Sequence, residues 1–339
     1  RLLAEGADIQ RTDNLGLSPL HLAAWGGHGA TLQLLLNKGA HVHARSKNKR
    51  TPLHNAAAAD GSGDVVQFLL DKGADANAKD GNGEVPICRA ATEGNHAAVQ
   101  ILLDNGADPN IVHTTLGGET PIHTAVCQGH LTIVQLLLAK GATINLKAKE
   151  GATPLFYSAR RGHVAIVQAL LDKGADVDVK NKQGLTPMFR AVVSGHAGIA
   201  QLLLARGANV HVKDTQGWTP LFHAVDVGND TLVQLLLDNG AVVEERSKKG
   251  ETPLYRASEE GHGALVQLLL DRGADVHAKD TDGWTPPFRR LCWSTRGHSS
   301  KNIRALARAH VMRRISKTAI APFLQNAVSA ALQNRLKIH

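Results

Sequence analysis

Hydrophobic and polar residues follow a fixed order within each stretch of about 33 residues, and residues 151–181 show it most clearly. Thr153 predicts a helix N-cap, and Pro154 predicts the first helical position, because the amide hydrogen that proline lacks would have no partner there. This first helix is expected to end at Gly162, where a residue without a Cβ can turn left-handed.

A second helix is predicted to open after His163 and to close at Gly174. Four of its residues recur at the three-to-four spacing that is typical of a buried stripe. They are Val164, Val167, Leu170 and Leu171. After this helix, Val177 and Val179 alternate with polar residues, which predicts an extended hairpin arm. One unit is therefore a helix, a turn, a second helix and a hairpin.

The same unit returns along the whole chain. The prolines that open the first helix are spaced 33, 34, 35, 33, 33, 33, 33 and 33 residues apart: Pro19, Pro52, Pro86, Pro121, Pro154, Pro187, Pro220, Pro253 and Pro286. A period of this length indicates a stacked array in which each unit buries its apolar face against its neighbours. The predicted fold class is an all-α solenoid, an α-α superhelix.

Three openings carry the most specific motifs: SPLHLAAWGGH at 18–28, TPLHNAA at 51–57 and TPIHTAVCQGH at 120–130. Together with the recurrent LLL..GAD closure, they resemble the ankyrin repeat family. The resemblance implies that hairpin tips and inner helices form a concave groove where partners dock. It also implies a structural role for His21, His54 and His123, which stand in the TPLH position.

Four segments are predicted from the phase of the repeats. They are the end of a truncated repeat at 1–12, eight ankyrin repeats at 13–285, a degenerate ninth or capping repeat at 286–315, and a basic tail, helical or disordered, at 316–339. The opening residues RLLAEGAD match the last turn of an outer helix. We therefore expect the chain to be a segment of a longer polypeptide.

Composition narrows the class of protein. Three cysteines without paired spacing indicate neither a disulfide framework nor a zinc knuckle. No apolar run reaches the roughly 18 residues of a membrane span. These features predict an intracellular protein, cytoplasmic or nuclear.

The sequence predicts no enzyme. Eighteen histidines are present, but most recur at repeat positions without companion carboxylates or thiolates. His41 and His43 form the only close pair and have no third ligand nearby. P-loop, GxGxxG, HExxH and GxSxG motifs are absent. No catalytic, cofactor or metal residue is assigned.

Candidate partner-binding residues come from the exposed face of the inner helices, where positions three and four apart lie together. They are Trp25, Arg89, Tyr157, Arg160, Arg161, Arg190, Trp218, Arg256, Glu259, Glu260 and Trp284. Trp218 and Trp284 are included because they follow the turn glycines Gly217 and Gly283. Tyr, Trp and Arg dominate binding hot spots, so a protein or peptide partner is expected in the groove. The alternative is a solvated face whose tryptophans pack on a neighbouring hairpin. A uniform glutamine column, Gln33 to Gln267, is explained either as a functional ladder or as duplication of one unit.

The net charge of +8 comes from the C-terminal segment. From residue 286 on there are eleven basic residues and no acidic one, which leaves 27 basic and 30 acidic residues, a net charge of −3, for the rest. Three interpretations stay open: a capping helix, a polybasic segment for acidic partners, RNA or anionic membrane, and a decayed or frameshifted repeat. The sequence thus favours a monomeric, non-catalytic protein-interaction scaffold. The alternative is an adaptor that works through its basic tail.

Overall fold

The computed structural model describes residues 8–113 and 117–286, and within them sixteen helices alternate between two layers. The inner helices are α1 (Pro19–Trp25), α3 (Pro52–Ala58), α5 (Pro86–Glu93), α7 (Pro121–Gln128), α9 (Pro154–Arg161), α11 (Pro187–Val193), α13 (Pro220–Asp226) and α15 (Pro253–Glu260). The outer helices are α2 (Gly29–Asn37), α4 (Gly63–Asp71), α6 (His96–Asp104), α8 (Leu131–Ala139), α10 (Val164–Asp172), α12 (Ala197–Ala205), α14 (Asp230–Asp238) and α16 (Gly263–Asp271).

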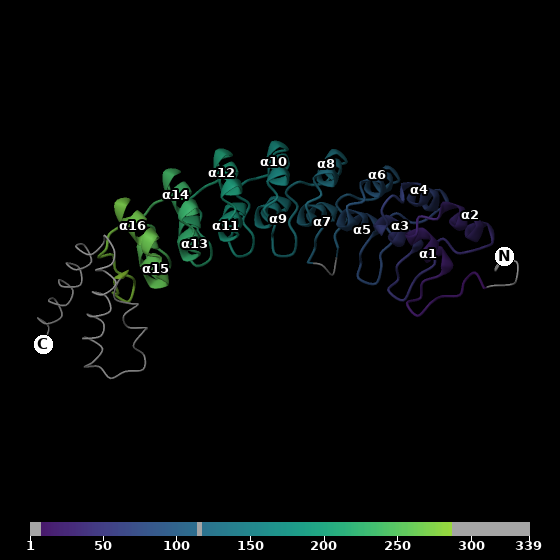
Figure 1. Cartoon of the computed structure of the whole chain (residues 1–339), viewed down its shortest axis with the longest axis horizontal. Helices are drawn as coiled ribbons and strands as arrows, with labels where there is room; N and C mark the ends of the chain where they lie inside the picture. The colour runs from purple at the N-terminus through teal and green to yellow at the C-terminus, as the bar shows by residue number, and fades with distance from the viewer. Residues whose placement is uncertain (1–7, 114–116, 287–339) are drawn as a thin grey trace, which may run out of the picture. The chain divides into compact units, whose positions relative to one another are not determined.

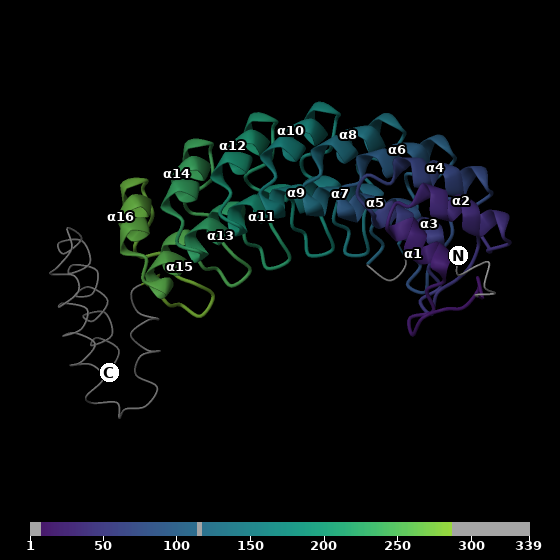
Figure 2. The same ribbon diagram turned by 45° about the vertical axis from the view of Figure 1, so that its right-hand side comes forward.

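The chain divides into two compact units, residues 1–182 and 183–339. In the first unit, α1, α3, α5, α7 and α9 pack side by side in one layer, and α2, α4, α6, α8 and α10 form the second (Figure 1). In the second unit, α11, α13 and α15 form the inner layer and α12, α14 and α16 the outer one. Figure 2 shows the connecting turns projecting from the ends of the inner helices. The fold is the predicted all-α solenoid of repeated helix pairs.

Each inner helix begins with proline, and in all but α5, where the preceding residue is Val85, that residue is serine or threonine. In α9 the Thr153 hydroxyl accepts a hydrogen bond from the Phe156 amide at 3.3 Å. In α3 the cap is reciprocal, because the Thr51 amide donates to Nδ1 of His54 at 3.1 Å. The structural role that the family resemblance implies for the TPLH histidines is therefore confirmed.

Several inner helices end at a left-handed glycine, and the packing around that glycine shows why no larger residue fits there. Gly129 has φ +86°, and a Cβ there would lie 2.9 Å from the ring of His163 in the next repeat. A side chain at this position is disfavoured by the positive φ angle and would also collide with the packed imidazole of His163. Gly162 and His163 form the turn between α9 and α10, as predicted.

The outer helices bury a stripe that differs by one residue from the predicted one. In α10, Ile166, Val167, Leu170 and Leu171 are buried. Val164, which we placed in this stripe, is 53% exposed. As the first residue of the helix it points away from the packed side, and Ile166 occupies the place in the core. The helix ends at Asp172, two residues before Gly174, whose φ is +85°.

The arms between repeats are turns, and the described residues contain no strand. In the turn at residues 80–84, the Asp80 amide donates to the Glu84 carbonyl at 2.8 Å and the Gly83 amide to the Asp80 carbonyl at 3.1 Å. Neighbouring turns are joined by single bonds, such as the Gly81 amide to the Asn48 carbonyl at 2.6 Å. One such bond per repeat is too few to form a ladder.

The glutamine column lies on the outer helices, where most of its members bond within their own helix. Gln67, Gln100, Gln168, Gln234 and Gln267 donate to the aspartate four residues later at 2.7–2.9 Å. Such pairs contribute a few tenths of a kcal/mol each to helix stability. The column therefore serves the helices themselves.

Candidate interaction surface

The inner helices pack against the neighbouring inner helices and against the outer layer, and one face of each stays uncovered. In α9, Leu155, Phe156, Ser158 and Ala159 are buried. Tyr157 is half-buried, and Arg160 and Arg161 are exposed. The fourth, seventh and eighth positions of an inner helix thus form its accessible face, where the sequence analysis placed the partner contacts.

Tyr157 and Arg160 are held together in the first unit. The guanidinium carbon of Arg160 lies 5.2 Å from the centre of the Tyr157 ring, within the range of a cation-π contact. The ring of His123 meets Tyr157 edge to face at 5.6 Å. Burial, and then the negative charge of Glu119, raise the pKa of Tyr157 to about 12, so the phenol stays protonated at neutral pH. The Tyr157 hydroxyl is hydrogen-bonded to Glu119, so the positive charge that this pair presents is the guanidinium of Arg160.

Arg161 extends the basic surface of α9 toward Cys127 of the preceding inner helix. Burial raises the pKa of the Cys127 thiol, and hydrogen bonding to Arg161 opposes this only in part. The sulfur is therefore a thiol at neutral pH and not a nucleophilic thiolate. Cys88 is fully buried, and burial raises its pKa to about 12.

Arg89 belongs to an ion-pair group with two acidic neighbours. Its terminal nitrogens lie 3.8 Å from Glu84 and 3.5 Å from Glu93. Arg50 approaches the same Glu84 at 3.6 Å and Asp80 at 3.3 Å. Burial raises the pKa of Glu84, while the charge of Arg89 lowers it. Arg89 is thus positioned by partners from its own repeat.

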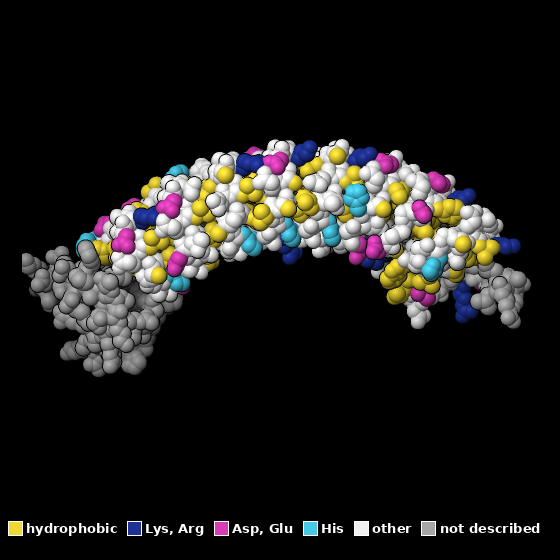
Figure 3. Space-filling model, turned by 45° about the horizontal axis from the view of Figure 1, so that its top comes forward, with side chains coloured by type: hydrophobic (Ala, Val, Ile, Leu, Met, Phe, Trp, Pro, Cys, Tyr) yellow, Lys and Arg dark blue, Asp and Glu magenta, His cyan; other side chains and the backbone are white. Residues whose placement is uncertain are grey.

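Trp25 lies on α1 with Leu22 one helical turn before it. Trp25 is 61% exposed and Leu22 is 49% exposed, which is unusual for side chains of this size. Figure 3 shows hydrophobic side chains gathered at the end of the first unit that contains α1. These two side chains therefore provide exposed apolar area on α1.

In the second unit, Arg256 contacts three other predicted residues, Trp218, Glu259 and Glu260. Its side chain bonds Asp226 at 2.6 Å, Glu259 at 2.7 Å and Glu260 at 3.1 Å. Its guanidinium carbon lies 5.1 Å from the centre of the Trp218 ring. Burial lowers the pKa of Arg256, but the three carboxylates outweigh it and the pKa is raised. The face that this group presents is acidic.

Trp218 is itself packed from two sides. It stacks on Phe222 with ring centres 5.8 Å apart, and it meets His223 at 5.2 Å. Nε2 of His223 lies 3.0 Å from Asp214, whose other oxygen accepts from the Trp218 amide at 2.9 Å. Arg190 and Trp284 are half-buried elsewhere in this unit. Asp226 was expected on the exposed face of its inner helix, 30 residues before Arg256, but neither Asp226 nor Glu119 was predicted as a partner contact.

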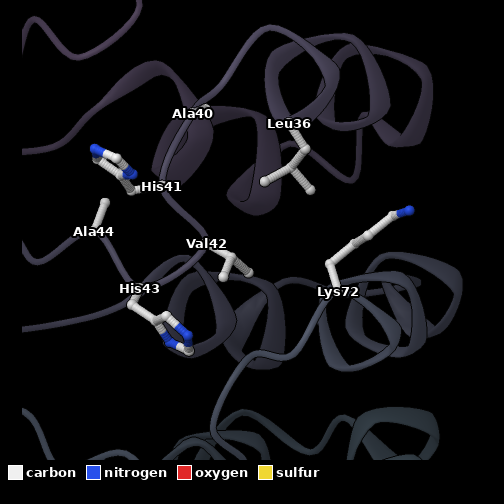
Figure 4. A pocket seen from close by; sticks show the side chains of 7 residues that line it. All are labelled: Leu36, Ala40, His41, Val42, His43, Ala44 and Lys72. Atoms are coloured by element: carbon white, nitrogen blue, oxygen red, sulfur yellow. The ribbon is translucent and has the colours of Figure 1, made fainter.

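The histidine pair on the first arm lines a shallow hollow with Val42, Leu36 and Lys72. Figure 4 shows the rings of His41 and His43 turned to different sides of the loop. In the part of the chain that the structure covers, no group of three or more potential ligands is placed to hold a metal. The same residues contain no helix long and apolar enough to cross a bilayer.

Comparison with known proteins agrees with this architecture. A family model described as ankyrin repeats in three copies matches residues 1–80, 57–148, 143–214 and 198–280. The chain therefore belongs to the ankyrin repeat family, whose members are in general non-catalytic modules for protein-protein interaction. It is similar to the human ASB11 ankyrin repeat domain, with 31% identity, a TM-score of 0.61, and coverage of 67% of this chain and 99% of that one. No curated protein matches the chain.

Proposed function

We propose that this protein binds a protein partner through the exposed face of its inner helices and performs no chemistry of its own. In the first unit the central contacts are Tyr157, Arg160 and Arg161 of α9. One observation carries this proposal: two consecutive arginines are exposed at the end of α9, and one of them already rests on the ring of Tyr157.

The chemistry of this group supports a partner that carries carboxylates. A guanidinium is planar and offers paired donors that match a carboxylate. The ring of Tyr157 adds rigid contact area beside the two guanidinium groups, while its hydroxyl is hydrogen-bonded to Glu119. Because the ring contacts already restrict Tyr157 and Arg160, binding has less side-chain freedom to remove.

The remaining predicted residues have supporting roles in this proposal. Trp25 supplies an apolar anchor on α1, and Arg89 supplies a positioned charge on α5. In the second unit, Trp218, Arg256, Glu259 and Glu260 present an acidic face around a rigid core, with Arg190 and Trp284 as further contacts. Mixed charge of this kind sets the register and the choice of partner more than the affinity.

We further propose a monomer that works in the cytoplasm or nucleus. Cys88 and Cys127 are both free thiols in the structure, as expected in a reducing compartment. The basic segment 287–339 lies outside the described residues, so the alternative of a tail-driven adaptor for RNA, acidic partners or membrane stays a prediction.

Charge reversal on α9 tests the proposal. The variant Arg160→Glu with Arg161→Glu is compared with Lys72→Glu with Lys173→Glu, which changes the charge equally at exposed ends of outer helices in the same unit. Proteins captured from a cell lysate by the unmodified chain should be lost with the first variant and retained with the second. Circular dichroism should be the same for all three proteins.

Two outcomes contradict the proposal. Equal loss with both variants indicates attraction by net charge alone. Retention with the α9 variant, together with loss when residues 300–339 are removed, assigns the capture to the basic tail.

A further inference from the structure

The turns between repeats differ in charge, and the difference depends on whether one position in the turn carries an aspartate. Six residues before the helix-opening proline, four turns carry an aspartate: Asp13, Asp80, Asp214 and Asp280. In each of them the carboxylate accepts backbone amides two and four residues later. For Asp80 these distances are 2.8 and 2.9 Å. The carboxylate thus closes the turn and places a negative charge in it.

Ser46 and Ser247 replace the aspartate in two other turns, and in the first unit two successive turns also lack this carboxylate. Ala148 and Asn181 stand in its place, and a lysine flanks each of them on both sides. The first of the two turns closes through its backbone alone, with the Ala148 amide bonded to the Ala152 carbonyl at 2.9 Å and the Gly151 amide bonded to Ala148 at 2.7 Å. We call the group Lys147, Lys149, Lys180 and Lys182 the lysine turns.

The lysine turns form one continuous surface. Lys147 and Lys180 share one register position, and Lys149 and Lys182 share another, so the four form two columns. The Lys182 amide donates to the Glu150 carbonyl at 3.0 Å, which places the two turns side by side. All four lysines are exposed, and Glu150 is the one carboxylate within the two turns.

At the first of these register positions, three basic residues of other repeats are engaged, whereas Lys79 and Lys279 are exposed and each precedes a turn aspartate. Arg45 donates to the Lys79 carbonyl at 3.1 Å, Lys213 lies 2.6 Å from Glu245, and Arg246 donates to the Lys279 carbonyl at 2.7 Å. In the described structure, the ammonium groups of the lysine turns make no such bond. Their charge is therefore available to a second molecule.

We infer that the lysine turns are an interaction surface for an acidic segment of a partner protein. Four unpaired ammonium groups repel one another, and an extended segment rich in Asp and Glu that crosses both turns would neutralise them. The patch is confined to two repeats, because the preceding turn carries Glu119. A duplex nucleic acid would require a longer basic surface, since its affinity comes from many phosphate contacts.

This surface is separate from the one proposed on α9. The lysine turns lie before the N-terminal ends of α9 and α11, whereas Arg160 and Arg161 lie at the C-terminal end of α9. Either surface can therefore fail its test without affecting the other.

A matched pair of variants of the whole chain tests the inference. Lys147, Lys149, Lys180 and Lys182 are changed to Gln in one variant. In the control, Lys38, Lys72, Lys140 and Lys173 are changed to Gln, which removes the same charge from exposed ends of outer helices in the same unit. Binding of a fluorescent peptide of alternating Glu and Ala is measured by anisotropy. We expect about tenfold weaker binding for the first variant and less than about twofold for the control.

Cross-linking with a carbodiimide, which joins carboxylates to lysines, locates the peptide on the unmodified chain. Links to the lysine turns support the inference. It is overturned by an equal loss of affinity in both variants, by no loss in either, or by links confined to lysines beyond residue 300. Tighter binding of a single-stranded DNA that is lost in the same variant assigns the surface to nucleic acid and contradicts the inference.

Discussion

The inner helices α1, α3 and α7 bury a histidine three residues after the N-cap, whereas α9, α11, α13 and α15 bury an aromatic ring at the same position. The first set comprises His21, His54 and His123, and the second Phe156, Phe189, Phe222 and Tyr255. We refer to them as the histidine repeats and the aromatic repeats. Their backbones are alike, so the comparison isolates what the side chain contributes.

In the histidine repeats the imidazole ring makes hydrogen bonds to its own N-cap residue and to the next repeat. Nδ1 of His21 accepts from the Ser18 amide at 3.2 Å, and its Nε2 lies 2.9 Å from the Arg50 carbonyl of the next repeat. His54 bridges Thr51 and Glu84 in the same way. Because Nδ1 accepts a hydrogen bond, it cannot carry a proton, and these rings must stay neutral.

In the aromatic repeats the same place is filled by apolar volume. Phe189 and Phe222 are completely buried, and the Phe189 ring packs edge to face on His223 with centres 5.3 Å apart. A phenylalanine ring contributes buried apolar area, and it does not ionise when the pH changes. The two sets should therefore respond to different perturbations, the aromatic repeats to loss of volume and the histidine repeats to acid.

The largest effect is expected for Phe189→Ala. Removing a fully buried ring should lower the free energy of unfolding by about 3–5 kcal/mol, because the cavity collapses only in part. Phe189→Leu, which keeps most of the volume, serves as control and should cost less than about 2 kcal/mol. Urea denaturation gives both values, and similar midpoints for the two variants would show that ring volume does not stabilise this position.

Acid should act on the histidine repeats. Burial lowers the pKa of His21 and His54, and it lowers that of His123 to about 4. The unfolded chain binds protons near pH 6.5 and the folded chain does not. The stabilisation is thus complete above about pH 6.5 and is lost as the pH falls toward 4, for His123 by on the order of 2–3 kcal/mol.

Replacing all three buried histidines by phenylalanine, the residue found at this position in most aromatic repeats, tests whether they cause the acid sensitivity. The variant His21→Phe, His54→Phe and His123→Phe should lose less stability between pH 7 and pH 4.5 than the unmodified chain. Thermal unfolding followed by circular dichroism across this range gives the two slopes. If the slopes are equal, the buried histidines do not account for acid sensitivity.

The smallest effect concerns the caps of the aromatic repeats. The Thr153 hydroxyl accepts from the Phe156 amide, whereas the buried Thr186 hydroxyl has no hydrogen-bond partner among the described residues. Thr153→Val should cost about 1 kcal/mol, and Thr186→Val should be close to neutral. Equal losses in urea denaturation would mean that Thr186 caps its helix in solution.

Local features of this fold could be predicted from the sequence, since they depend on nearby residues. The cap at Thr153, the left-handed Gly162 and the start of α10 after His163 all involve residues a few positions apart. Val164 was misassigned because three-to-four spacing fits more than one stripe on a helix in which most residues are apolar.

The candidate surface was less predictable, because its contacts join repeats. The spacing of three and four places Glu259 and Glu260 near Arg256, but the bond to Asp226 depends on how one inner helix is set against the next. Likewise Trp218 follows a turn glycine in the sequence, and only the structure shows that Phe222 and Arg256 cover its ring.

Hydroxyl-radical footprinting of the chain, alone and with a captured partner, tests the central claim most directly. The account predicts protection of Tyr157 and neighbouring side chains on the exposed face of the inner helices, with no change at exposed outer-helix residues such as Val164. Protection confined to the outer helices or to residues beyond 287, with Tyr157 equally reactive in both samples, would contradict it.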